Sequence, residues 1–161
     1  NGFIISHFVN LSAAKQLIQI DAINKNTTFF LVKHISNLRT IFLYNFTINH
    51  SKMEHGVHIA KIESLICLKC KAFLEMVERK NSGDSVDSKH ISKHKKDVFR
   101  LAAMLAPADR FVVPKSLFDD IHEFCDLVRN DLPDANFFNS AGLKGVDPNS
   151  LVEILIKCFG L

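Results

Sequence analysis

Lys69 is the residue whose surroundings in the sequence point most directly to chemistry. Apolar residues recur around it at intervals of three and four, so a helix here would aim Lys69 into the middle of its own apolar stripe. A lysine is almost never fully buried without a partner. Its ammonium group therefore either reaches solvent along the edge of the core or faces an anion such as phosphate. Lys71 and a basic run at 89–96 add weight to the phosphate interpretation.

Asp97 is the natural partner for Lys69. It lies on the flank of the apolar stripe of a second predicted helix, on the same side as His90 and His94. A carboxylate in this place would orient Lys69, hold a metal or serve as a base. The alternative is an ordinary ion pair between helices, which contributes little to stability if it is exposed.

The densest positive stretch of the chain is residues 89–96, KHISKHKK. Lys89, Lys93 and Lys96 lie about one helical turn apart, so they form one basic face. Such a run is either a solvated helix face or a surface that attracts the phosphates of a nucleotide or an RNA. The second interpretation predicts binding that weakens steeply with salt.

A zinc site is the other chemistry that the residue types suggest. Cys67 and Cys70 have the C-x-x-C spacing, and His90 and His94 are one turn apart. The 19 residues between Cys70 and His90 exceed the roughly 12–15 of a zinc finger. We therefore interpret the cysteines as small helix residues and predict no metal site.

The spacing of apolar residues, which predicts the strands and helices that position these side chains, changes near residue 61. β-branched and aromatic or alternating runs predict strands at 18–23, 28–32, 40–44 and 57–60. Helical periodicity with capping and proline signals then predicts four helices: 62–80, a second from Asp87 or Ser88 to before Pro107, a third from Pro114 to before Pro133, and a last one opened by Asp147 and Pro148. The pattern predicts an α+β fold, with a small N-terminal β-sheet in residues 1–60 and a lobe of about four helices in residues 61–161.

Composition sets the class of protein. The 161 residues are 47% apolar and carry a net charge of +3, as in an ordinary globular domain. No apolar stretch approaches the roughly 18 residues of a membrane span, and four cysteines are too few for a disulfide framework, so we expect a cytoplasmic protein without membrane contact. Residues 61–106 hold ten Lys or Arg against six Asp or Glu, whereas residues 107–161 hold five against nine. This basic middle favours an anionic ligand.

Two stretches of the chain, residues 54–74 and 86–101, together with the ending at 142–146 and 159–161, resemble bacterial nucleotidyltransferase-like proteins of the AbiEii/AbiGii toxin type. The resemblance covers about two thirds of the chain. Such proteins pair a catalytic sheet with a helical lobe that carries L-K-x-x-A and R-D-x-x-D patterns. The first corresponds to LKCKA at 68–72, which gives Lys69 the phosphate-contacting role. The second corresponds in part to KDVFR at 96–100, with Asp97 as its first Asp and Arg100 in place of its second.

The catalytic motifs of the family's sheet have no counterpart here. Its Gly-Ser or Gly-Gly motif and D-x-D metal pair are missing, since the first sixty residues have glycine only at 2 and 56 and aspartate only at 21. The chain also starts without Met, which favours a chain that begins downstream of these motifs. Residues 18–21 resemble the family's strand with a third carboxylate, where Gln19 or Asp21 would stand.

Two hypotheses follow. The resemblance implies the C-terminal portion of a nucleotide-transferring protein, which in its intact form uses Mg²⁺ and a nucleoside triphosphate, modifies an RNA or protein acceptor and has an antitoxin as partner. The phosphate-binding residues would then be Lys69, Lys71, Lys93 and Lys96, with Asp97 as the catalytic residue, and this chain alone would be inactive. The alternative is a non-catalytic interaction module whose basic helical face binds RNA or an acidic protein.

Overall fold

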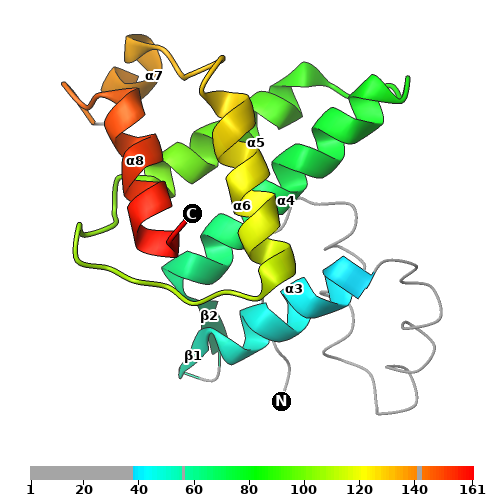
Figure 1. Cartoon of the computed structure of the whole chain (residues 1–161), viewed down its shortest axis with the longest axis vertical. Helices are drawn as coiled ribbons and strands as arrows, with labels where there is room; N and C mark the ends of the chain where they lie inside the picture. The colour runs from blue at the N-terminus through cyan, green and yellow to red at the C-terminus, as the bar shows by residue number, and fades with distance from the viewer. Residues whose placement is uncertain (1–37, 56, 141–142) are drawn as a thin grey trace. The chain divides into compact units, whose positions relative to one another are not determined.

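The computed structural model describes residues 38–55, 57–140 and 143–161. The chain divides into two compact units, residues 1–64 and residues 65–161 (Figure 1). Helices predominate, and a small antiparallel sheet precedes the helical part, so the fold is α+β as the sequence predicts. The strands predicted at 18–23 and 28–32, with Gln19 and Asp21, lie outside the described residues.

Among the residues that the structure describes, one helix and one hairpin lie wholly within the first unit. Helix α3 (Leu38–Asn49) leads into strand β1 (Ser51–Glu54), which pairs antiparallel with β2 (Val57–Ala60) in the register Ser51 to Ala60. Only two residues join the strands, and His55 takes the left-handed conformation, with φ 50°, that tight hairpin turns require. The strand predicted at 57–60 is confirmed.

The strand predicted at 40–44 is wrong, because these residues belong to α3. The run of β-branched and aromatic residues is short, and its local preference for a strand is overridden by burial. Leu43 and Phe46, three residues apart, are both buried, which requires a helical period. The Thr47 hydroxyl donates to the Leu43 carbonyl at 2.8 Å, a bond that threonine makes within helices.

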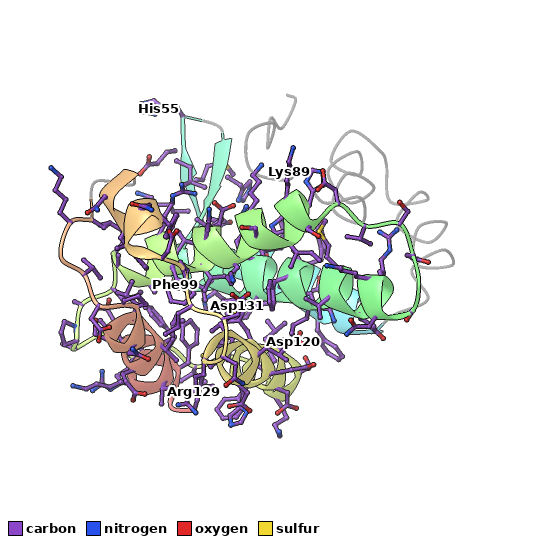
Figure 2. All side chains as sticks on the ribbon, turned by 90° about the horizontal axis from the view of Figure 1, so that it is seen from above. His55, Lys89, Phe99, Asp120, Arg129 and Asp131 are labelled. Atoms are coloured by element: carbon purple, nitrogen blue, oxygen red, sulfur yellow. The ribbon has the colours of Figure 1, made fainter. Side chains whose placement is uncertain are left out.

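The second unit is a bundle of helices. Helix α4 (Ile62–Asn81) begins in the first unit and continues into the second, where α5 (Ser88–Ala102), α6 (Lys115–Val128), α7 (Ala135–Ser140) and α8 (Pro148–Phe159) follow. Helices α6 and α8 contact each other, and Figures 1 and 2 show them as one layer packed across α4 and α5. The four predicted helices are confirmed, and α7 is an additional one.

The helix boundaries follow their capping residues. Asp87 caps α5 by accepting a hydrogen bond from the Lys89 backbone N–H at 2.8 Å. Asp147 caps α8 in the same way, with Pro148 in its first turn, and Gly160 ends α8 in the left-handed conformation with φ 69°. Helices α5 and α6 end at Ala102 and Val128, several residues before the prolines predicted to stop them.

Aromatic rings join the layers of the helical unit. The Phe124 ring of α6 is fully buried and meets the Phe73 ring of α4 edge to face, with centroids 5.2 Å apart. It also lies 6.4 Å from the Phe99 ring of α5. Phe99 is labelled in Figure 2 between the two layers. This cluster fixes α5 against its neighbours, and α5 carries the residues discussed below. No helix in the described ranges is long and apolar enough to cross a membrane.

Truncation of the central ring tests this core. We expect Phe124→Ala to lower the free energy of unfolding by about 3–5 kcal/mol, because it removes a buried ring from three-helix packing and leaves a cavity. The matched control is Val112→Ala, since the Val112 side chain is 91% exposed and its loss should change little. Urea denaturation measures both; similar midpoints for the two variants would contradict this account of the core.

Candidate functional site

Lys69 and Asp97 form the ion pair that the sequence predicts. Lys69 Nζ of α4 donates to Asp97 Oδ2 of α5 at 2.8 Å, and the two side chains are 15% and 19% exposed. The pair connects two consecutive helices through residues that are 28 positions apart along the chain. A partly buried lysine is therefore satisfied by an internal carboxylate, which confirms Asp97 as the partner of Lys69.

Asp97 also binds a second cation. Arg100 Nη1 donates to Asp97 Oδ1 at 3.1 Å, one helical turn further along α5. Each carboxylate oxygen of Asp97 thus accepts from a different basic side chain. Arg100, which stands where the AbiEii-type pattern has its second aspartate, balances the charge of Asp97 here.

Lys71 does not join Lys69. Residues two positions apart on a helix are separated by about 200° around its axis, so Lys71 extends from the other side of α4. Its buried Nζ lies 3.8 Å from Asp120 Oδ1 of α6 and 3.8 Å from Glu75 Oε1. Burial raises the pKa of Glu75, and the charge of Lys71 offsets part of that rise. Lys71 is therefore surrounded by carboxylates within the bundle and does not converge with Lys69 on one phosphate.

The basic run of α5 divides between two faces. The buried side chain of Lys95 donates to the Asp131 carbonyl at 2.8 Å and to the Asp131 carboxylate, at the end of α6. On the other side, Lys89, Lys93, Lys96 and Arg100 recur at intervals of four, three and four, and so share one side of the helix. We call these four residues the basic stripe.

The basic stripe faces outward. Lys89 and Lys93 are exposed, Lys96 is half-buried, and the Arg100 side chain is 49% exposed. In Figure 2, Lys89 lies at the start of α5, on the side away from α6. Among the described residues, no carboxylate lies within ion-pair distance of Lys89, Lys93 or Lys96. These three lysines therefore offer positive charge that no carboxylate in the described part of the chain neutralises.

Phe137 of α7 supports one end of the basic stripe. Its ring centroid lies 5.3 Å from Lys96 Nζ and 5.0 Å from Arg100 Cζ, within the range of cation–π contact. Sequence reasoning missed this residue because α7 was not predicted. The available signal was Asp134, whose carboxylate accepts from the Phe137 backbone N–H at 2.8 Å, followed by two phenylalanines.

His94 is buried beside the Lys69–Asp97 pair and is 2% exposed. Neither of its ring nitrogens has a hydrogen-bond partner among the described residues. Burial lowers the pKa of His94 to about 4, and the positive charge of Lys69 acts in the same direction. His94 is therefore neutral at physiological pH.

The residues considered for zinc do not assemble into a metal site. Among the described residues, no group of three His, Cys, Asp or Glu side chains is arranged to hold a metal ion. Cys67 and Cys70 are buried in α4, as expected for small helix residues. Burial, with added effects from Cys125, Cys67 and Asp120, raises the pKa of Cys70 well above its usual value, which opposes the thiolate that zinc requires.

Comparison with protein-family models, curated proteins and solved structures finds no match to this chain.

The buried His94 makes stability depend on pH. The histidine pKa is 6.5 when unperturbed and about 4 here, so the unfolded chain binds more protons between these values and stability falls as the pH falls from 6.5 to 4. The shift corresponds to roughly 3 kcal/mol. We expect His94→Phe, which keeps a ring, to remove most of this dependence in urea denaturation at a series of pH values.

The matched control for this experiment is His90→Gln, since His90 is exposed on the same helix. It should retain the dependence of the original protein. Parallel pH curves for His94→Phe and the original protein would show that His94 is not buried as described.

Proposed function

We propose that the helical unit, residues 65–161, binds the phosphate backbone of RNA through the basic stripe of α5. The observation that carries the proposal is the presence of four cations on one exposed helix face, three of them without an acidic partner among the described residues. At 1.5 Å per residue the stripe is roughly 16 Å long, so it can contact several phosphates of one strand.

The lysines of α4 and α5 that lie outside the stripe support this choice of surface. Lys69, Lys71 and Lys95 each have a carboxylate within ion-pair distance. Redirecting Lys69 or Lys71 is costly, because Asp97 and Asp120, which are 19% and 2% exposed, would be left in a partly dry environment. Lys95 is held by Asp131, which is itself exposed. Lys89, Lys93 and Lys96 carry no such cost, because no described carboxylate lies within ion-pair distance of them.

An RNA backbone suits the stripe better than an acidic protein does. The core of a protein–protein interface is apolar and rich in aromatic residues. The exposed large apolar side chains described in this unit are Met104, Val112 and Leu127, and none belongs to the stripe. Binding of backbone phosphates depends mainly on positive side chains, and it does not depend on the base sequence.

The test is titration of a fluorescent uridine oligonucleotide at several salt concentrations. We expect dissociation constants of about 10⁻⁴ to 10⁻⁶ M near physiological salt, weakening as salt rises. Lys93→Ala with Lys96→Ala should weaken binding at every salt concentration. It should also reduce the slope of log K against log salt by about one to two, because two phosphate contacts are lost.

The control removes the same charge elsewhere. Lys144 and Lys157 are exposed and lie outside α5, so Lys144→Ala with Lys157→Ala changes the net charge equally. If the two double variants lost the same affinity for the oligonucleotide, the effect would come from net charge alone, which would contradict the proposal. A polyglutamate chain that binds as tightly as the oligonucleotide would favour an acidic protein partner.

A second candidate is the helical lobe of a nucleotide-transferring protein, as the AbiEii-type resemblance implies. The observation that favours it is the Lys69–Asp97 pair, which the resemblance makes the phosphate-contacting and catalytic residues and which remains partly exposed. Mg²⁺, the acceptor and an antitoxin would belong to the intact protein. The described residues supply no metal-binding group, so we derive no metal-dependent step for this chain.

Titration with ATP and GTP, with and without magnesium, tests the second candidate through amide chemical shifts. If Lys69 contacts phosphate, Lys69→Ala should abolish saturable binding, whereas Lys93→Ala with Lys96→Ala should leave most of it. If saturable binding is lost only in Lys93→Ala with Lys96→Ala, nucleotide binding belongs to the basic stripe. An absence of shifts at millimolar nucleotide would contradict this candidate.

We place either function in a reducing compartment such as the cytoplasm. The support is that all four cysteine side chains are buried and that Cys70, Cys125 and Cys158 are thiols whose pKa values burial raises.

A further inference from the structure

The four cations of the basic stripe differ in how firmly they are held. Lys96 Nζ and Arg100 Cζ lie within 5.3 Å and 5.0 Å of the same ring centroid, that of Phe137. Arg100 has a second contact, the 3.1 Å hydrogen bond to Asp97. Lys89 and Lys93 are exposed, and neither makes a side-chain contact of this kind with the described residues. Contacts with neighbouring side chains therefore hold one end of the stripe, whereas no described contact of this kind holds the other end.

The Phe137 ring is itself fixed. It is only 4% exposed and meets the Phe138 ring at 4.8 Å in an edge-to-face contact. The Phe138 ring in turn meets the Phe99 ring of α5 edge to face at 6.1 Å. The Phe138–Phe99 contact thus fastens α7 to the helix that carries the stripe, and Phe138 in turn packs against the Phe137 ring that supports both cations.

This arrangement leaves donors available for an anion. A guanidinium group has five N–H donors in one plane, and Arg100 directs one nitrogen to Asp97 while it lies over Phe137. Its remaining N–H groups can bind phosphate oxygens in the paired geometry that arginine favours. Lys96 adds a second charge at the same ring. Two cations held near each other repel, and an anion that contacts both relieves that repulsion.

We propose that Lys96 and Arg100, positioned by the ring of Phe137, hold one phosphodiester of a bound RNA strand, and that Lys89 and Lys93 contribute long-range attraction. This inference rests on the proposed RNA-binding function. Lys96 and Arg100 are preorganised, so little side-chain freedom is lost when phosphate binds. Lys89 and Lys93 must be ordered by the ligand, which reduces the affinity that each can add.

Two charge-matched double variants test the assignment. Lys96→Ala with Arg100→Ala and Lys89→Ala with Lys93→Ala each remove two positive charges from the stripe. We expect the first to weaken binding of the uridine oligonucleotide roughly tenfold, from lost hydrogen bonds to charged groups, and the second about two- to threefold. Both should lower the salt dependence, because both remove cations near phosphate.

Phe137 requires a variant that keeps all the charges. We expect Phe137→Leu, which retains apolar bulk but lacks the aromatic face, to weaken binding roughly two- to fivefold with an unchanged salt slope. Phe137→Tyr keeps the ring and should restore affinity. Inorganic phosphate should shift the Arg100 side-chain Nε–H resonance in the original protein, and less so in Phe137→Leu. Circular dichroism of each variant verifies its folding.

The outcomes separate the two levels of the proposal. If the original protein does not bind the oligonucleotide, the RNA-binding function itself is wrong. If it binds and the two double variants lose affinity equally, the function stands and the Lys96–Arg100 site is wrong. An Arg100 resonance that responds equally to phosphate in Phe137→Leu would overturn the positioning role of Phe137.

Discussion

The burial of one face of α5 is the constraint on which the helical unit depends. Val98, Phe99 and Ala102 are fully buried, and the Phe99 ring lies against rings from α6 and α7. Once this face is buried, the helical period requires residues on the opposite side to face outward. The basic stripe is therefore exposed because the apolar face is buried. The same packing holds α7 in place and brings an aromatic ring to the stripe.

Ion pairs sort the lysines of α4 and α5 discussed above into two groups: those with a carboxylate partner and those of the stripe. Lys69 and Lys95 reach carboxylates 28 and 36 residues away, on or beyond neighbouring helices. A partly buried ammonium group needs such a partner, because it loses water that the interior does not replace. The lysines of the stripe remain hydrated and need none. This division favours the stripe as the surface for an anionic ligand, and it gives Asp97 a structural part that either functional candidate must accommodate.

Much of the element order follows from local signals. The helices around Lys69 and Asp97 were predicted because their apolar residues repeat at three and four, and the caps at Asp87 and Asp147 mark helix starts. The run at 40–44 was misassigned because a few β-branched residues satisfy a strand and a helix alike. Helix α7 escaped prediction because six residues are too few to show a period. The Lys69–Asp97 pair was predictable because Lys69 points into the apolar stripe of its own helix and needs a partner there, and Asp97 lies on the flank of the apolar stripe of the next helix.

The sequence by itself determined the α+β order, the four longer helices of the second unit, and the presence of more cations on α5 than its own acidic residues can balance. Only the tertiary structure decided which of those cations stay available. Lys71 and Lys95 are neutralised by Asp120 and Asp131, whose proximity depends on how α6 packs against α4 and α5. The contact of Phe137 with Lys96 and Arg100 likewise depends on where a short helix docks. Periodicity shows which side of a helix a residue occupies, whereas the partner across from it is set by packing between segments distant in sequence.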